Sequence, residues 1–391
     1  MTRIIQEEFK DDLLSRGYSR RQMMNAVAML GGASVLAGLS PEHAWAADAP
    51  MQPAKVRIGT NECWTGPMPA GLAALNEVAS QCNRYNPRGE PAALVRMISQ
   101  TENIPEDHIS VWPGAYAALA RSVIAFCSPT KGLVTCDPAY ETPGEAAEWL
   151  GAPTKAVPLR ADYSHDVKAM LAANPNAGLY YICNPNNPTA TMTPMADMEW
   201  LVDNRPAGSI VVIDEAYIHW TRDYPNNTAT HLAAAGKDVM VFRTFSKIFG
   251  MAGMRVGYFM ARPDIIKKIS LYDKGEPSSQ LPIPSVACAT ASLTDHVSFA
   301  ARRKELMTNR AATIDFLTKR NLKVIGVSDA NFLMVDWKTK TAKEMQAAFR
   351  AQGVQIAGAR WPTWPTVSRV TIGSKEDMEG FFTALNKVVS A

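Results

Sequence analysis

The residues with the clearest chemical potential in this sequence lie around Lys247. This lysine ends the segment 243–247 (Arg-Thr-Phe-Ser-Lys), which follows an apolar run at 239–242. An amine at the end of a strand can form an imine with a carbonyl compound. The hydroxyls of Thr244 and Ser246 and the guanidinium of Arg255 are suited to binding a phosphate. The alternative is a surface loop with a solvated lysine.

A carboxylate ends the apolar run before that one, in Ile213-Asp214-Glu215-Ala216-Tyr217. Such a carboxylate can keep a pyridinium nitrogen protonated, and the ring then acts as an electron sink for a carbanion. Asp-Glu after a strand is equally suited to a nucleotide hydrolase. However, the sequence contains no Gly-x-x-x-x-Gly-Lys-Ser/Thr loop, which removes most of that alternative.

Further polar or aromatic groups follow other apolar runs. The segment 184–189 (Asn-Pro-Asn-Asn-Pro-Thr) holds an amide that can donate to a phenolate oxygen, although Asn-Pro pairs are also common in turns. Ala115 and Tyr116 open an expected helix, and a helix amino terminus favours phosphate. Tyr140 can stack on a heterocycle.

The elements that must position these groups are short apolar runs alternating with helical patterns. The runs lie at 109–112, 132–136, 179–183, 210–213, 239–242 and 256–260. Runs of this kind are typical of strands buried on both faces, and helices between them predict a mainly parallel α/β sheet. Ligands of such sheets bind outside the carboxyl ends of the strands.

A second, smaller α/β unit is expected in the carboxyl-terminal part. Residues 285–320 are rich in helical pattern, and apolar runs at 332–335 and 370–372 flank a helical segment at 341–352. Residues 55–80 are expected to complete this unit. We therefore predict an amino-terminal arm and part of the small domain at 48–85, a large domain at 86–280 and a small domain at 281–391.

Composition and charge exclude several classes of protein. With 391 residues, 47% hydrophobic content and a formal net charge of +3, the chain is expected to be globular. It has no run of five Lys or Arg residues, so a nucleic-acid partner is not expected. The six cysteines contain no Cys-x-x-Cys pair and no His-Glu-x-x-His occurs, so no metal site is expected.

Residues 1–47 have a different character. Arg20 and Arg21 precede a glycine-containing apolar run at 26–39, and Ala44-Trp45-Ala46 offers a small-residue cleavage site. This order resembles a twin-arginine signal, which implies the twin-arginine export machinery as a partner and a periplasmic or secreted enzyme. No stable membrane anchor is expected once the signal is removed. The alternative is an amphipathic helix that packs on the domain.

The strand-end segments, taken in this order, resemble fold-type I pyridoxal-phosphate enzymes. They are most similar to the histidinol-phosphate aminotransferase branch of the class I/II aminotransferases. The most specific segments are Asn-Pro-Asn-Asn-Pro-Thr at 184–189, Asp-Glu-Ala-Tyr at 214–217 and the run from Arg243 to Tyr258. The resemblance covers essentially all of residues 55–391.

The resemblance implies a role for each matching residue. Lys247 bonds pyridoxal 5'-phosphate as a Schiff base and carries the proton, while Asp214 pairs with the pyridine nitrogen and Tyr217 with the ring oxygen. The implied cofactor-binding residues are Tyr85, Ala115, Tyr116, Tyr140, Asn187, Asp214, Tyr217, Thr244, Ser246, Lys247 and Arg255. Tyr85 matches a tyrosine that reaches the phosphate of the partner subunit, so a homodimer with shared sites is implied.

The implied substrate-binding residues are less uniform. Arg369 falls where the family clamps the substrate α-carboxylate, and a planar guanidinium suits that geometry. Asn61 and Asn331 match positions near the substrate. The histidinol-phosphate enzymes usually carry an arginine for the substrate phosphate where Ala357 stands, and Arg360 lies three residues on, beside Trp361. This departure predicts a substrate other than histidinol phosphate.

The leading interpretation is a transaminase that uses an amino acid and a 2-oxo acid. The same electron sink also serves an oxidase, a lyase or a cyclase of an amino acid. A non-catalytic binding protein on the same fold is the second alternative. His219 lies just beyond Tyr217 and is interpreted as a wall residue in preference to an extra base.

Overall fold

The computed structural model describes residues 7–31, 54–86, 88–273 and 277–389. A seven-stranded sheet has the order β2-β8-β7-β6-β5-β3-β4. The strands are β2 (Ile109–Trp112), β3 (Leu133–Asp137), β4 (Thr154–Pro158), β5 (Leu179–Cys183), β6 (Ile210–Asp214), β7 (Val239–Thr244) and β8 (Gly257–Met260). Strands β3 to β7 run parallel, whereas β8 is antiparallel to both β7 and β2. The prediction of a mainly parallel α/β sheet is confirmed.

Every apolar run predicted in the large domain forms a strand, but β4 was missed. Strand β5 is buried throughout, as its apolar sequence requires. Strand β4 is mostly exposed, because it lies at the edge of the sheet. An exposed edge strand needs no apolar run, so its sequence carries no such signal.

Helices cover both faces of this sheet. Their bounds are α5 (Glu90–Glu102), α6 (Ala115–Phe126), α7 (Thr142–Leu150), α8 (Val167–Ala173), α9 (Met195–Asn204), α10 (Thr230–Ala234) and α11 (Pro263–Ser270). Helices α6, α7 and α11 pack on one face, and α5, α8, α9 and α10 pack on the other. The strand side chains alternate between the two cores: Tyr181 faces α6, whereas Tyr180 and Ile182 face the opposite side.

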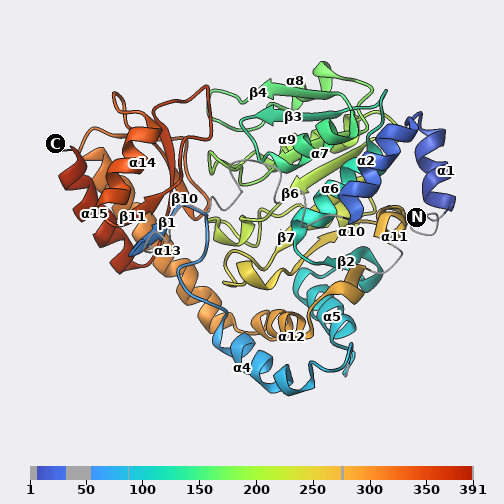
Figure 1. The fold of residues 1–391 in the computed structure, drawn as a ribbon, viewed down its shortest axis with the longest axis horizontal. Helices are drawn as coiled ribbons and strands as arrows, with labels where there is room; N and C mark the ends of the chain where they lie inside the picture. Colours follow the sequence, from blue (N-terminus) through green and yellow to red (C-terminus); the bar gives the residue numbers. More distant parts are fainter. Residues whose placement is uncertain (1–6, 32–53, 87, 274–276, 390–391) are drawn as a thin grey trace.

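The smaller unit lies beside the large one (Figure 1). A three-stranded antiparallel sheet has the order β12-β10-β9, and β1 pairs in parallel with β11. The elements are β1 (Val56–Ile58), β9 (Lys323–Ile325), β10 (Phe332–Asp336), β11 (Val354–Ile356), β12 (Val367–Thr371), α13 (His296–Thr318), α14 (Ala342–Ala351) and α15 (Lys375–Val389). Residues 56–58 thus join the carboxyl-terminal unit. The exact domain limits remain a prediction.

Local signals set the helix ends. Helix α14 begins with a capping box, in which Thr341 and Glu344 satisfy each other's backbone amides. Helix α7 ends at Gly151, whose left-handed φ of 70° suits glycine. Helices α4 (Pro69–Val78) and α12 (Ile283–Ser292) pack together below the two units (Figure 1).

The amino-terminal residues in the described part form α1 (Glu7–Ser15) and α2 (Arg20–Gly31). Both lie against the large domain, on the side of α6 and α7 (Figure 1). Packing on the domain was the alternative to an export signal, and side chains between Phe9 and Val27 pack on the large domain in this way. The rest of the predicted signal, 1–6 and 32–47, lies outside the described residues. In the described part, every helix is too short or too polar to cross a membrane.

Candidate active site

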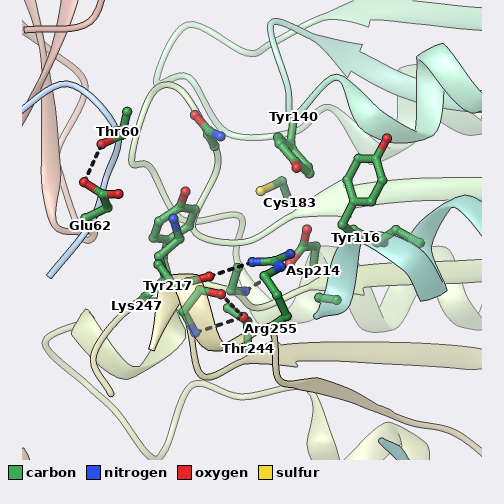
Figure 2. A pocket seen from close by; sticks show the side chains of 16 residues that line it. Thr60, Glu62, Tyr116, Tyr140, Cys183, Asp214, Tyr217, Thr244, Lys247 and Arg255 are labelled. Atoms are coloured by element: carbon green, nitrogen blue, oxygen red, sulfur yellow. Dashed lines mark hydrogen bonds between the residues drawn. The ribbon is translucent and has the colours of Figure 1, made fainter. Parts of the chain in front are cut away.

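A pocket opens at the carboxyl ends of β3, β5, β6 and β7, where the strand rule places a ligand. It brings together most of the residues that the sequence singled out. Its lining includes Ala115, Tyr116, Tyr140, Asn187, Asp214, Tyr217, Thr244, Ser246, Lys247 and Arg255. Figure 2 shows Tyr116, Thr244 and Arg255 toward one end of this pocket and Thr60 and Glu62 at the other.

Asp214 lies in the pocket at the end of β6 and is 3% exposed. Its Oδ2 accepts a hydrogen bond from the Tyr181 hydroxyl at 2.9 Å, and its Oδ1 accepts from the Ala216 amide at 3.0 Å. Burial raises the pKa of Asp214 to about 6, against the hydrogen bonds and the charge of Lys247. A buried carboxylate is stabilised by a cationic partner, so a pyridinium N–H fits this position.

Lys247 follows β7, and its Nζ donates to the carbonyl of Asn61 at 3.2 Å. Burial, with the positive charges of Arg369 and Arg255, lowers the pKa of Lys247 to about 8. A lysine with this pKa has a substantial neutral fraction near physiological pH and can attack an aldehyde.

The phosphate end of the pocket is built from three short segments. Gly114 precedes α6 with φ of 84°, and a Cβ there would lie 2.6 Å from Nη2 of Arg255. The guanidinium therefore lies directly against the amino terminus of α6, whose first amides have no partner within the helix. The Thr244 hydroxyl donates to Ser246 Oγ at 3.0 Å. Amides, hydroxyls and a guanidinium around one end fit a phosphate.

The substrate end centres on Arg369 in β12, which is 5% exposed. Its Nη1 donates to Asn187 Oδ1 at 2.6 Å, and its Nε has no partner among the described residues. Arg369 Nη2 donates to the Gly59 carbonyl at 3.4 Å, and Lys247 Nζ donates to the Asn61 carbonyl two residues on, at 3.2 Å. Arg369 and the reactive amine thus meet the same short segment.

Asn61 and Asn331 connect the small domain to this site. Asn61 Nδ2 donates to the Tyr217 hydroxyl at 3.1 Å, and its Oδ1 accepts from Thr371 at 3.2 Å. Asn331 Nδ2 donates to the carbonyls of Asn61 and Glu62, both at 3.3 Å. Both asparagines thus hold the segment that faces Lys247.

Five predicted residues lie outside the pocket lining. Asn61, Asn331 and Arg369 contact residues that line it, whereas Tyr85 and Arg360 lie further away. Tyr85 is 100% exposed, and its reach to a partner subunit remains a prediction. Arg360 lies on the loop 357–366, with Nη1 3.8 Å from Glu141 Oε1 of the large domain. Its side chain thus bridges the two domains, and direct contact with substrate remains a prediction.

His219 is buried and lies outside the pocket lining, so its position gives no support to a role as an extra base. It is buried among Tyr224, Phe249 and Phe299, with Nε2 3.4 Å from Arg243 Nη1. Burial and the adjacent arginines lower the pKa of His219 well below its usual range, so it stays neutral.

Sequence reasoning missed Tyr181, Glu62 and Thr60. Tyr181 resembles an ordinary core residue because it lies within an apolar run. However, Tyr181 and Cys183 share one face of β5, next to Asp214 on β6. The two-residue period of a strand, together with the polar hydroxyl, is the signal that could have identified it.

The comparisons with known proteins agree with this geometry. The model of the family "Aminotransferase class I and II" matches residues 53–385, so the chain belongs to the class I/II aminotransferases. It is a pyridoxal-phosphate-dependent transaminase of an amino-acid-related substrate.

Individual relatives have different substrates in their names. A histidinol-phosphate aminotransferase of Moorella thermoacetica is 30% identical over 86% of each chain. An aromatic amino acid aminotransferase of Rhodococcus jostii is 29% identical over 84% of this chain and 89% of its own. The crystal structure of histidinol-phosphate aminotransferase from Sinorhizobium meliloti with pyridoxal-5'-phosphate has a TM-score of 0.77 at 24% identity, covering 87% of this chain and 92% of its own.

Proposed function

We propose that this transaminase takes an amino acid with a bulky apolar or aromatic side chain and no phosphate group. The observation that carries the proposal is the position of Trp361, whose ring centroid lies 5.8 Å from the guanidinium carbon of Arg369. A substrate held by its carboxylate on Arg369 would therefore have this ring close by. An indole face favours apolar and aromatic groups.

Two further observations support this substrate class. Ala357, where histidinol-phosphate enzymes usually carry an arginine, is 5% exposed and offers no positive charge. Relatives of similar identity include both histidinol-phosphate and aromatic amino acid aminotransferases, so overall similarity does not separate the two. The substrate class must therefore be inferred from the residues near Arg369, and these favour a substrate with an uncharged side chain.

The chain's own residues supply positioning and proton transfer. When bound, pyridoxal phosphate supplies an electron sink for charge on the substrate α-carbon. Arg369 orients the carboxylate, and Asp214 keeps the pyridine nitrogen protonated. Lys247, with a pKa of about 8, can carry a proton to and from the α-carbon near neutral pH.

The test compares phenylalanine, alanine and histidinol phosphate as amino donors to the wild type and Trp361→Ala. We expect phenylalanine to be the best donor and its kcat/KM to fall about tenfold in the variant, corresponding to ~1.4 kcal/mol of aromatic contact. Alanine should lose less than about threefold, because its methyl group does not reach the ring. Val297→Ala, at an 83% exposed position outside the pocket lining, is the control.

Equal losses for phenylalanine and alanine would show that Trp361 only supports Arg369. A wild type that prefers histidinol phosphate would contradict the proposed class directly.

We also propose that the enzyme is a homodimer with shared sites. The fully exposed ring of Tyr85 supports this, since a large aromatic side chain in solvent is typical of a residue that contacts a partner. Sedimentation of the holoenzyme at twice the monomer mass would be the expected result.

We propose, finally, export by the twin-arginine route to the periplasm or the medium. Ser19-Arg20-Arg21 and the apolar run after it support this, and both arginines are exposed. Cell fractionation of the wild type and an Arg20→Lys/Arg21→Lys variant tests it. The variant should stay in the cytoplasm.

A further inference from the structure

Helices α1 and α2 precede the region that matches the family model, which begins at residue 53. They nevertheless share a hydrophobic core with the large domain. Phe9, Leu13, Tyr18, Met23 and Ala26 are all buried in the cluster that contains α6, α7 and α11. The Phe9 ring meets the ring of Tyr272 edge-on, with centroids 5.1 Å apart. The segment thus occupies a defined surface of the folded domain.

Arg16 fixes the segment to the end of α6. Its Nη1 donates to the carbonyls of Ala125 at 3.1 Å and Cys127 at 2.8 Å, and the Tyr18 hydroxyl donates to Cys127 at 2.6 Å. The last carbonyls of a helix lack partners within it and carry a partial negative charge. Arg16 therefore caps α6 at the end opposite the phosphate site. These carbonyls take this position only once α6 has folded.

Helix α2 makes a second contact, with α7. Asn25 Nδ2 donates to the carbonyl of Trp149 at 3.1 Å, and Trp149 Nε1 donates back to the carbonyl of Asn25 at 3.1 Å. Gly151 leaves room for Gln22, since a Cβ there would lie 2.8 Å from Gln22 Nε2. The contact between α2 and α7 thus combines specific hydrogen bonds with apolar packing.

The export motif lies on the same helix. Arg20 and Arg21 face solvent, whereas Met23 and Ala26, one turn further on, are buried against the domain. We infer that the folded large domain binds its own export signal, so that docking of α2 competes with binding of α2 by the export machinery. This inference rests on the proposed export. The docking surface is the face of α6, α7 and Tyr272, and its occupant is residues 7–26.

The test uses the full-length holoenzyme and an Arg16→Ala variant. We expect hydrogen–deuterium exchange across residues 7–26 to be at least about tenfold faster in the variant, because the caps to α6 are lost. Lys10→Ala removes an exposed positive charge from α1, six residues before Arg16, and should exchange like the wild type. The visible absorbance of the bound cofactor should be retained in all three proteins.

Export is measured in the same variants by cell fractionation. The exported fraction should rise at least twofold in Arg16→Ala and stay unchanged in Lys10→Ala. Adding Arg20→Lys/Arg21→Lys should abolish export in either background. If Arg16→Ala reduces the yield of folded protein, Asn25→Ala loosens the α7 contact alone and should give the same direction of change.

Fast exchange at 7–26 in the wild type would overturn the docking. Faster exchange in Arg16→Ala with an unchanged exported fraction would overturn the competition while leaving export intact. Absence of export from every variant, with the expected exchange difference, would instead overturn the export proposal and leave the docking standing.

Discussion

Burial sets the ionisation of three charged residues in and beside the active site. Lys247, Asp214 and Arg369 are each shifted most strongly by burial, which disfavours the charged form of any group. Arg369 further lowers the pKa of Lys247, and Lys247 lowers that of Asp214. The amine of Lys247 is therefore reactive mainly because it is buried, and the nearby Arg369 adds to the effect.

The pH dependence of cofactor attachment follows from this arrangement. The neutral amine of Lys247 is the attacking form, and its fraction rises with pH until the pKa of about 8 is passed. Attachment of pyridoxal phosphate to apoprotein should thus accelerate about tenfold per pH unit below that value and level off above it. An unshifted lysine would level off only above about 10.4. Stopped-flow absorbance measures the rate.

Arg369→Gln provides the matched comparison. Removing the second cation should raise the pKa of Lys247 and move the plateau to higher pH. A plateau at the same pH in both proteins would show that Arg369 has no influence on the amine.

At the scale of elements, the phosphate site depends on how closely β8 approaches α6. Gly257 begins β8, and a Cβ there would lie 2.5 Å from the Ala115 amide nitrogen and 3.1 Å from the Arg243 carbonyl. Only glycine permits this distance without moving the amino terminus of α6, from which the phosphate amides point.

Gly257→Ala is therefore expected to raise the dissociation constant for pyridoxal phosphate by at least about tenfold, the effect of ~1.4 kcal/mol. Gly253→Ala lies on the same connection between β7 and β8, but its Cβ would meet nothing within 4 Å. It should bind the cofactor like the wild type. Equal affinities for all three proteins, measured by spectral titration, would refute the role of this close approach.

Neighbouring residues of one strand end serve different purposes. Asp214 faces the pocket, whereas Glu215 points the other way and forms an ion pair with Arg243 at 2.7 Å. Arg243 also pairs with Glu102 at 3.0 Å, which joins β7 to α5. The alternation of a strand assigns one carboxylate to chemistry and the next to the framework.

At the scale of the whole molecule, the site lies between two units that the chain assembles from distant segments. Asn61 and Arg369 come from the small unit, and Lys247 and Asp214 from the large one. The pair Arg360–Glu141 bridges the two beside the substrate end. A change in the relative orientation of the two units would therefore affect binding of the substrate carboxylate more than binding of the cofactor.

The proposed dimer makes a prediction at this scale. Tyr85→Phe removes one hydroxyl from a fully exposed side chain, so the folded monomer should be unaffected. If that hydroxyl reaches the partner's cofactor phosphate, cofactor affinity should fall about tenfold, the value of a hydrogen bond to a charged group. Spectral titration of the dimer measures it. Unchanged affinity would place Tyr85 outside the partner's site.

The sequence alone predicted the cofactor, all but one strand of the large sheet and most of the residues that line the pocket. Buried parallel strands require long apolar runs, and the strand rule places the polar residues after them, such as Asp214 and Lys247, at one edge. These signals are local, so they can be recognised in the sequence alone. The family model matches residues 53–385, a range that includes these segments.

Tertiary structure alone decided the features that depend on distant contacts. Strand β4 forms at an exposed edge, Tyr181 supports Asp214 from a neighbouring strand, and Arg360 turns to Glu141. The residues around Arg20 and Arg21 appear in the sequence as an export signal, yet 7–26 also packs on α6 and α7. An amphipathic segment does not encode its partner surface, because that surface exists only after the domain has folded.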